Sequence, residues 1–143
     1  MFGPAGHLYV YFTYGMHWCA NVVTSPTGTP DAVLLRALAP IDGLSAMHAA
    51  RPRARRDRDL CSGPAKLCQA MGLDRAFQGA DLVTGDRGVG LFDDGTPPPA
   101  VPGQGPRIGI SRAVELPWRW WVAGDPNVSP GGRSGPARPD ATG

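Results

Sequence analysis

Several residue types that define common protein classes are scarce in this sequence. Lys66 is its only lysine and Glu115 its only glutamate among 143 residues. The three cysteines, Cys19, Cys61 and Cys68, form no Cys-x-x-Cys pair, and their odd number argues against a disulfide framework and against a zinc site. We therefore expect a protein of a reducing compartment.

Long apolar runs are missing as well. No stretch approaches the length of a membrane span, and the N-terminus carries neither the basic nor the apolar region of a secretory signal. We expect a cytoplasmic protein with no membrane contact. The formal net charge of +2 is too small to indicate a nucleic-acid-binding protein by itself.

Glycine and proline are abundant, with 20 and 16 residues, and most of them lie in the second half. The hydrophobic content of 42% nevertheless fits one globular domain with its own core. From Pro130 onward the Gly, Pro, Ser and Arg composition predicts a disordered tail over residues 130–143. The folded domain is therefore expected over residues 1–129.

An aromatic stretch near the start holds all three tyrosines of the protein. Residues 7–13 and 17–23 are aromatic and β-branched, which predicts two strands of a β-hairpin. If three residues connect the strands, Tyr11 and Asn21 share one face of the hairpin, whereas a two-residue connection would put them on opposite faces. Tyr14 lies beyond the last strand pair and would project from the tip.

A tyrosine-lined hairpin has two interpretations. Tyrosines on a half-buried strand commonly serve only packing. Alternatively, their electron-rich faces stack on a flat ligand ring and attract a cationic one. The hairpin alone does not decide between these interpretations.

The rest of the chain predicts a single α+β domain, in which a curved, mainly antiparallel sheet carries a few helices. The expected strands and helices, and a Trp120–Trp121 pair expected to fill the core, follow from periodicity and from Pro and Gly boundaries. Strands are expected over residues 32–38, 89–92, 107–111 and 118–122, and helices over residues 42–50, with Asp42 as cap, and 64–72.

Three groups of basic residues invite a functional interpretation beside a structural one. Arg36 interrupts an apolar strand, where a guanidinium is costly unless it is paired, although it could also extend to solvent from a strand end. Ser62 and Lys66 flank a helix start that suits a phosphate, or they belong to an ordinary capped helix. The arginines within residues 51–58 could follow a DNA backbone, or form a solvated face diluted by acidic neighbours.

Several blocks of the sequence resemble the methylpurine DNA glycosylase family, whose members are also called alkyladenine or 3-methyladenine DNA glycosylases. The hairpin motif Tyr-x-Tyr-x-x-Tyr-Gly-Met and the helix start Ser-Gly-Pro-x-Lys-Leu occur together, which makes the resemblance specific. In the order in which the family has them, the blocks are residues 1–21, 33–38, 60–70, 107–110 and 117–119.

The resemblance implies DNA base-excision repair by a nucleoid-associated monomer acting on duplex DNA. The enzyme would flip an alkylated purine of the 3-methyladenine type out of the stack and hydrolyse its N-glycosidic bond, without a metal or other cofactor. The resemblance also assigns Tyr11, Asn21 and Arg36 to the base pocket, where Asn21 would help to exclude guanine. It assigns Tyr14 to intercalation into the duplex. The remaining implied DNA contacts are Gly15, Met16, His17, Ser62 and Lys66.

The catalytic glutamate of the family lies in a motif upstream of the part that this sequence matches, so no catalytic residue is assigned. Relative to the family, we expect a domain truncated at its N-terminus, with Met1 an internal methionine of a longer protein. Two other accounts are an inactive truncated product, and replacement of the glutamate by Asp31 or Glu115. The competing functions are a non-catalytic binding module for damaged bases or DNA, a stacking platform for single-stranded RNA, and a fragment without function.

Overall fold

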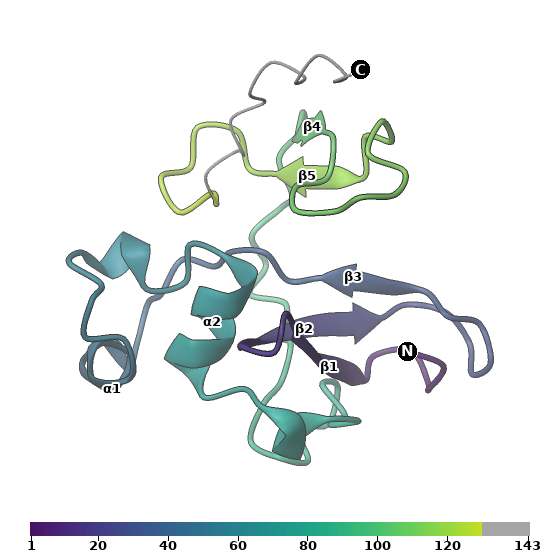
Figure 1. Ribbon diagram of the computed structural model, residues 1–143, viewed down its shortest axis with the longest axis horizontal. Coiled ribbons are helices and arrows are strands. Elements are labelled where there is room, and N and C mark those ends of the chain that lie inside the picture. The colour runs from purple at the N-terminus through teal and green to yellow at the C-terminus, as the bar shows by residue number, and fades with distance from the viewer. Residues whose placement is uncertain (130–143) are drawn as a thin grey trace, which may run out of the picture.

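A computed structural model describes residues 1–129, and the predicted tail at residues 130–143 lies outside the described part. Within it, the combination of short helices with two antiparallel sheets forms a single α+β domain, as predicted (Figure 1). The elements in chain order are β1 (Leu8–Thr13), β2 (His17–Val23), β3 (Ala32–Leu34), α1 (Leu44–Ala50), the 3-10 helix η1 (Asp57–Asp59), α2 (Pro64–Met71), the 3-10 helix η2 (Arg75–Phe77), β4 (Gly103–Gly105) and β5 (Arg119–Trp121).

The first sheet has the strand order β1-β2-β3, with both pairings antiparallel. In the hairpin, Tyr9 lies opposite Asn21 and Tyr11 lies opposite Cys19. This register requires a three-residue connection, so the side chains of Tyr11 and Asn21 share a face. Both hairpin strands fall where the sequence predicts them.

The hairpin connection is a tight turn with two left-handed residues. The Met16 amide donates to the carbonyl of Thr13 over 3.1 Å. Between them, Tyr14 and Gly15 adopt φ angles of 53° and 64°. Glycine enters this region without steric cost, but a tyrosine there is strained, and such strain is most often found at functional sites.

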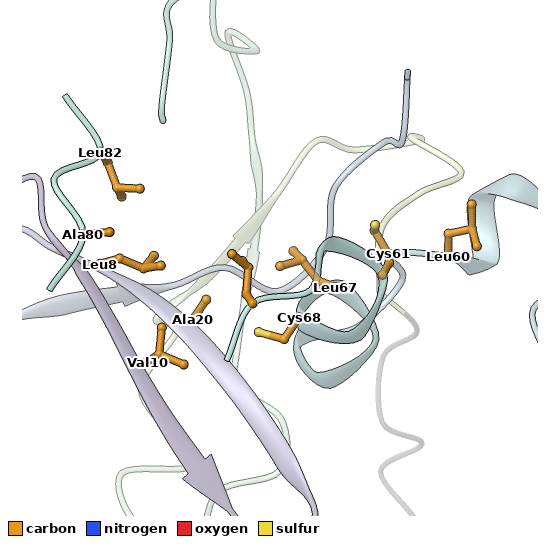
Figure 2. Packing of buried hydrophobic residues seen from close by; sticks show 11 residues of the cluster. Leu8, Val10, Ala20, Leu60, Cys61, Leu67, Cys68, Ala80 and Leu82 are labelled. Carbon is orange, nitrogen blue, oxygen red and sulfur yellow. The ribbon is translucent and has the colours of Figure 1, made fainter. Parts of the chain in front are cut away.

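The core lies between the β1–β2 hairpin and α2 (Figure 2). Leu8, Leu60 and Leu67 are fully buried, and each contributes roughly 1.5–3 kcal/mol through removal of apolar surface from water. Helix α2 begins at Pro64 and ends before Gly72, whose φ of 66° provides a left-handed cap. The helix predicted over residues 64–72 is therefore confirmed.

The two edges of the first sheet differ. Residues 78–82 cover the outer edge of β1, where the Leu8 amide donates to Ala80 and the Gly79 amide donates to Leu8, each over 2.8 Å. Strand β3 is the last strand at the opposite edge. Among residues 1–129, backbone hydrogen bonds thus cover the β1 edge, whereas β3 is the last strand at the other edge.

Two predicted elements are shorter than expected. The strand over residues 32–38 ends at Leu34, because the chain turns away until the Leu38 amide donates to Cys61 over 3.2 Å. The helix over residues 42–50 starts at Leu44, since Gly43 is left-handed at φ 70° and the Asp42 carboxylate accepts from the Gly43 amide instead of capping the helix.

The late part of the chain departs most from prediction. No strand forms over residues 89–92 or 107–111, and a second sheet pairs β4 with β5 instead. The tryptophans expected in the core lie on this small sheet. Trp120 is 56% exposed, and the Trp121 indole packs on the backbone of Gly103, where a Cβ would lie 2.3 Å from the ring.

Candidate functional site

A cleft of about 890 Å³ opens between the first sheet and the late part of the chain. One wall is formed by β3 and the segment that continues it, and the other by residues around β5. Tyr11, Asn21 and Arg36 all line this cleft. The structure therefore brings together the three residues that sequence reasoning assigned to a base pocket.

Tyr11 presents an aromatic face held by its neighbour. The rings of Tyr9 and Tyr11 lie 5.7 Å apart with an interplanar angle of 25°, a stacked arrangement. Burial raises the pKa of the Tyr11 hydroxyl, and the adjacent Cys19 raises it further. Tyr11 is therefore neutral at physiological pH and offers an electron-rich ring for stacking.

Asn21 contributes a fixed amide. Only 7% of this residue is exposed, and its Nδ2 donates to the carbonyl of Tyr9 over 3.2 Å. The hydrogen bond restrains the side chain at the floor of the cleft. A rigid polar group at this point can discriminate between ligand edges by shape and by hydrogen bonding.

The guanidinium of Arg36 has few hydrogen-bond partners within the described chain. Its Nη1 donates to the carbonyl of Ile108 at 3.5 Å, and its Nε is buried with no hydrogen-bond partner among the described residues. Burial lowers the pKa of Arg36, and the nearby Arg119 cation lowers it further. A buried guanidinium without a counter-charge favours binding of an anion.

Two further arginines line the cleft, and sequence reasoning missed both. Arg107 lies over the Trp118 ring at 5.1 Å, and Arg119 lies over the Trp121 ring at 4.7 Å. The Nη2 of Arg119 also donates to the carbonyl of Ser129 over 2.8 Å. Alternation of Arg and Trp in the late segment was the available signal, since guanidinium and indole groups stack.

The hairpin tip stands out from the domain. Tyr14 is 79% exposed and Met16 69% exposed, and His17 is exposed beside them. The Tyr14 hydroxyl donates to the carbonyl of Gly109 at 3.4 Å, so the tip lies against the late segment that also meets Arg36. An exposed aromatic side chain at a protruding tip is able to insert between the base pairs of a duplex.

Comparison with known proteins agrees with this geometry. The sequence pattern of the methylpurine-DNA glycosylase (MPG) family matches residues 1–126. The chain belongs to this family. A Burkholderia lata protein provisionally named 3-methyladenine DNA glycosylase is 59% identical over 129 residues, covering 90% of this chain and 62% of that protein.

More distant glycosylase-family relatives show similar coverage. A Nocardia farcinica protein with the same provisional name is 44% identical over 150 residues, covering 99% of this chain and 66% of the relative. A Chlorobaculum tepidum protein, again of that name, is 48% identical over 90% of this chain and 60% of its own length. The chain spans about three fifths of the length of the curated relatives that it matches.

Ser62 and Lys66 do not line the cleft of this glycosylase-family chain, but they border its wall. The Lys66 Nζ donates to the Ser62 hydroxyl over 3.3 Å. Cys61, which precedes Ser62, accepts the hydrogen bond from the Leu38 amide of the cleft wall. Ser62 and Lys66 therefore flank the turn that is bonded to Leu38 of the cleft wall.

Family chemistry requires a carboxylate beside the scissile bond. Neither Asp31 nor Glu115 lines the cleft, and the Asp31 carboxylate accepts from the Ser25 hydroxyl over 2.7 Å. Asp125 is the one acidic residue of the lining among residues 1–129, and sequence reasoning missed it. Its Oδ1 accepts from the Asn127 amide over 2.7 Å, so that oxygen serves a local turn.

Residues 1–129 provide neither a cluster of metal-ligating side chains nor a membrane-spanning helix. No group of three or more His, Cys, Asp or Glu side chains is placed to hold a metal ion. No helix in the same range has the length and apolar character needed to cross a bilayer.

Proposed function

We propose that this chain acts in DNA base-excision repair, in the excision of alkylated purines of the 3-methyladenine type from duplex DNA. The observation that carries the proposal is that Tyr11, Asn21 and Arg36 line one cleft while Tyr14 projects from the tip of the same hairpin. The provisional names of its relatives support the same substrate class.

In the proposed reaction, Tyr14 enters the base stack and fills the space left by the flipped nucleotide. The damaged base enters the cleft and stacks on Tyr11. An alkylated purine carries positive charge, so the neutral tyrosine ring binds it by cation–π attraction as well as stacking, worth about 2 kcal/mol when desolvated. Asn21 crowds the exocyclic amino group of guanine, and Arg36 meets the sugar-phosphate of the flipped nucleotide.

Hydrolysis then requires a water molecule held against the anomeric carbon. Water forms the new C–O bond and gives one proton to a carboxylate, while the N-glycosidic bond breaks and its electron pair leaves with the purine. Among the described residues, Asp125 is the carboxylate of the cleft, and its Oδ2 makes no hydrogen bond there. The second candidate function, binding of damaged bases without catalysis, follows if Asp125 cannot activate water.

One experiment separates these functions. The chain is incubated with duplex DNA containing a single methylated purine, and base release and binding are both measured against an undamaged duplex. Base release that is lost in Asp125→Asn supports hydrolysis by this chain. Preferential binding without release supports the binding module, and equal affinity for both duplexes contradicts the proposed function.

The proposal also covers the cellular location, the oligomeric state and the extent of the folded domain. We infer that the protein works in the cytoplasm on nucleoid DNA and is a monomer, with residues 1–129 as one folding unit. Size-exclusion chromatography at several concentrations tests the monomer. Limited proteolysis should leave a stable product that ends near residue 129.

A further inference from the structure

The segment that joins α1 to α2 carries a concentration of arginines within residues 51–58. In the sequence, Asp57 and Asp59 stand next to these arginines and dilute their positive charge. In the structure, each of the two acids is engaged with a specific basic partner. The remaining arginines form no ion pair with either acid in the described chain.

The two acidic side chains are committed within the segment. Asp59 forms a bidentate ion pair with Arg56, with Nε–Oδ2 at 2.9 Å and Nη2–Oδ1 at 3.0 Å. The Nε2 of His48 lies 2.8 Å from Oδ1 of Asp57. Arg53, Arg55 and Arg58 are exposed and form no ion pair or hydrogen bond with the rest of the described chain, and we call these three residues the arginine loop.

The backbone that carries the arginine loop is held in place. The Nη1 of Arg51 donates to the carbonyls of Asp59 and Leu60, which closes the segment on itself. The Ala54 amide donates to the Arg51 carbonyl over 2.9 Å, and the Ala54 side chain packs against the core. Because the backbone is already ordered, binding through these arginines does not require the loss of conformational entropy that ordering a loop would involve.

The arginine loop is also continuous with the cleft. The Ser62 hydroxyl donates to the Asp59 carbonyl over 3.3 Å, and Lys66 donates to Ser62. The cleft wall joins the same turn through the hydrogen bond from Leu38 to Cys61. Figure 1 shows this segment rising from α1 to the N-terminal end of α2, on the side of α2 that faces away from the sheet. A polyanion that enters the cleft would therefore find positive charge along its path outside it.

We propose that Arg53, Arg55 and Arg58 form a second DNA-binding surface, which contacts the phosphodiester backbone of duplex DNA beside the nucleotide held in the cleft. Arginine suits this role because its planar guanidinium binds phosphate oxygens in a bidentate manner. The contact is independent of base sequence and of damage. The identity of the polyanion as duplex DNA rests on the proposed function.

The test measures affinity for an undamaged duplex across a range of salt concentrations. Each phosphate contact contributes a slope of about −0.9 in a plot of log affinity against log salt concentration. The triple variant R53Q/R55Q/R58Q should lose about 3 from the magnitude of the slope, equally on undamaged and alkylated duplexes. Its melting temperature should match that of the wild type, because the three side chains form no ion pair or hydrogen bond with the rest of the described chain.

Arg75 supplies the matched control, since it is also exposed and outside any ion pair of the described chain. R75Q should change the slope by less than about half of one phosphate contact. An unchanged slope in the triple variant, or an equal loss per charge in R75Q, overturns the proposal. Tighter wild-type binding to single-stranded RNA or to anionic vesicles, lost in the triple variant, overturns duplex DNA as the partner.

The preference for alkylated over undamaged duplex tests the proposed function, and the salt slope tests the arginine loop. If the wild type does not distinguish alkylated from undamaged duplex, the proposed function fails, while the salt slope still reports on the arginine loop. If the wild type prefers alkylated duplex and the triple variant keeps both preference and slope, only the second surface fails.

Discussion

The Tyr14 hydroxyl donates to the carbonyl of Gly109 over 3.4 Å, joining the hairpin tip to a segment 95 positions later. The preceding residue, Ile108, accepts the hydrogen bond from Arg36. One short stretch thus contacts both the exposed tip and the cationic wall of the cleft. A DNA strand that displaced Tyr14 from Gly109 would act on the same stretch that supports Arg36.

Replacement of Tyr14 separates stability from DNA binding. At φ 53° the tyrosine backbone is strained, so Tyr14→Gly should raise the free energy of unfolding by about 1 kcal/mol. The same variant lacks the ring proposed to intercalate and should bind a duplex with an alkylated purine about 5- to 150-fold more weakly, the equivalent of 1–3 kcal/mol of stacking. Urea unfolding and fluorescence anisotropy measure the two effects.

Two variants control this prediction. Tyr14→Ala removes the ring but keeps the strain, so it should bind weakly without the gain in stability. Tyr14→Phe loses only the hydrogen bond to Gly109 and should bind nearly as well as the wild type. Weak binding by the phenylalanine variant would contradict the intercalation role.

Arg36 should prove more important for ligand binding than for folding. Arg36→Met removes a buried nitrogen without a partner and the repulsion from Arg119, so the free energy of unfolding should stay unchanged or rise by about 1 kcal/mol. Affinity for duplex DNA should fall roughly 10- to 150-fold, the loss of one charged hydrogen bond. Arg36→Lys should retain part of the affinity. If Arg36→Met unfolds the domain, the residue has a structural role instead.

The buried thiols should make the protein sensitive to alkaline pH. Burial raises the pKa of Cys68 to about 11, and burial also raises the pKa values of Cys19 and Cys61. A thiol whose pKa is higher in the folded state stabilises below its unfolded pKa, and this stabilisation is lost as pH rises through the folded pKa. Cys68 alone should lower the free energy of unfolding by about 2 kcal/mol between pH 9 and 11.

Denaturant titrations at several pH values measure this loss. Cys68→Ala should reduce the fall with pH, although its stability at neutral pH should be lower because a buried sulfur is removed. The same fall in Cys68→Ala as in the wild type would assign the alkaline sensitivity to other groups.

Gly103 should be essential to the small second sheet. A methyl group there would collide with the Trp121 indole, and overpacking of this kind costs about 1–3 kcal/mol. Gly103→Ala should therefore speed amide hydrogen exchange in β4 and β5 while the core of α2 stays protected. Gly3→Ala, where nothing lies within 4 Å, is the control and should change neither region.

The hairpin could be predicted because its information is local. Alternating aromatic and β-branched residues, interrupted at Gly15, specify both strands, and the opposed positions of Tyr11 and Cys19 follow from the connection length. The end of β3 could not be predicted in this way. Its apolar pattern continues past Leu34, and the carbonyl of Cys61, in a distant loop, is what draws the chain away.

The cleft could not be predicted from local sequence patterns. Its second wall comes from an irregular segment, and the hydrogen bond between Arg36 and Ile108 spans 72 positions. The entry of Asp125 into the lining has no periodic signature, and the alternation of Arg and Trp around Arg119 does not specify that these side chains face the cleft. Tyr11, Asn21 and Arg36 could nevertheless be grouped in advance, because the resemblance supplied the spatial relation that the pattern lacks, and all three line the cleft.

The unequal edges of the first sheet restrict how it can grow. Along β1, the amide of Leu8 is bonded to Ala80 and the amide of Val10 to the Gln78 side chain, so this end of the strand is closed to a further strand. A polypeptide that extended the sheet at its other edge would align beside β3 and would run past Arg36. An acidic strand added beside β3 would be attracted by the Arg36 guanidinium and would compete with other anions for it. A basic strand would be repelled by the same group, so the charge of the incoming strand decides whether it can add there.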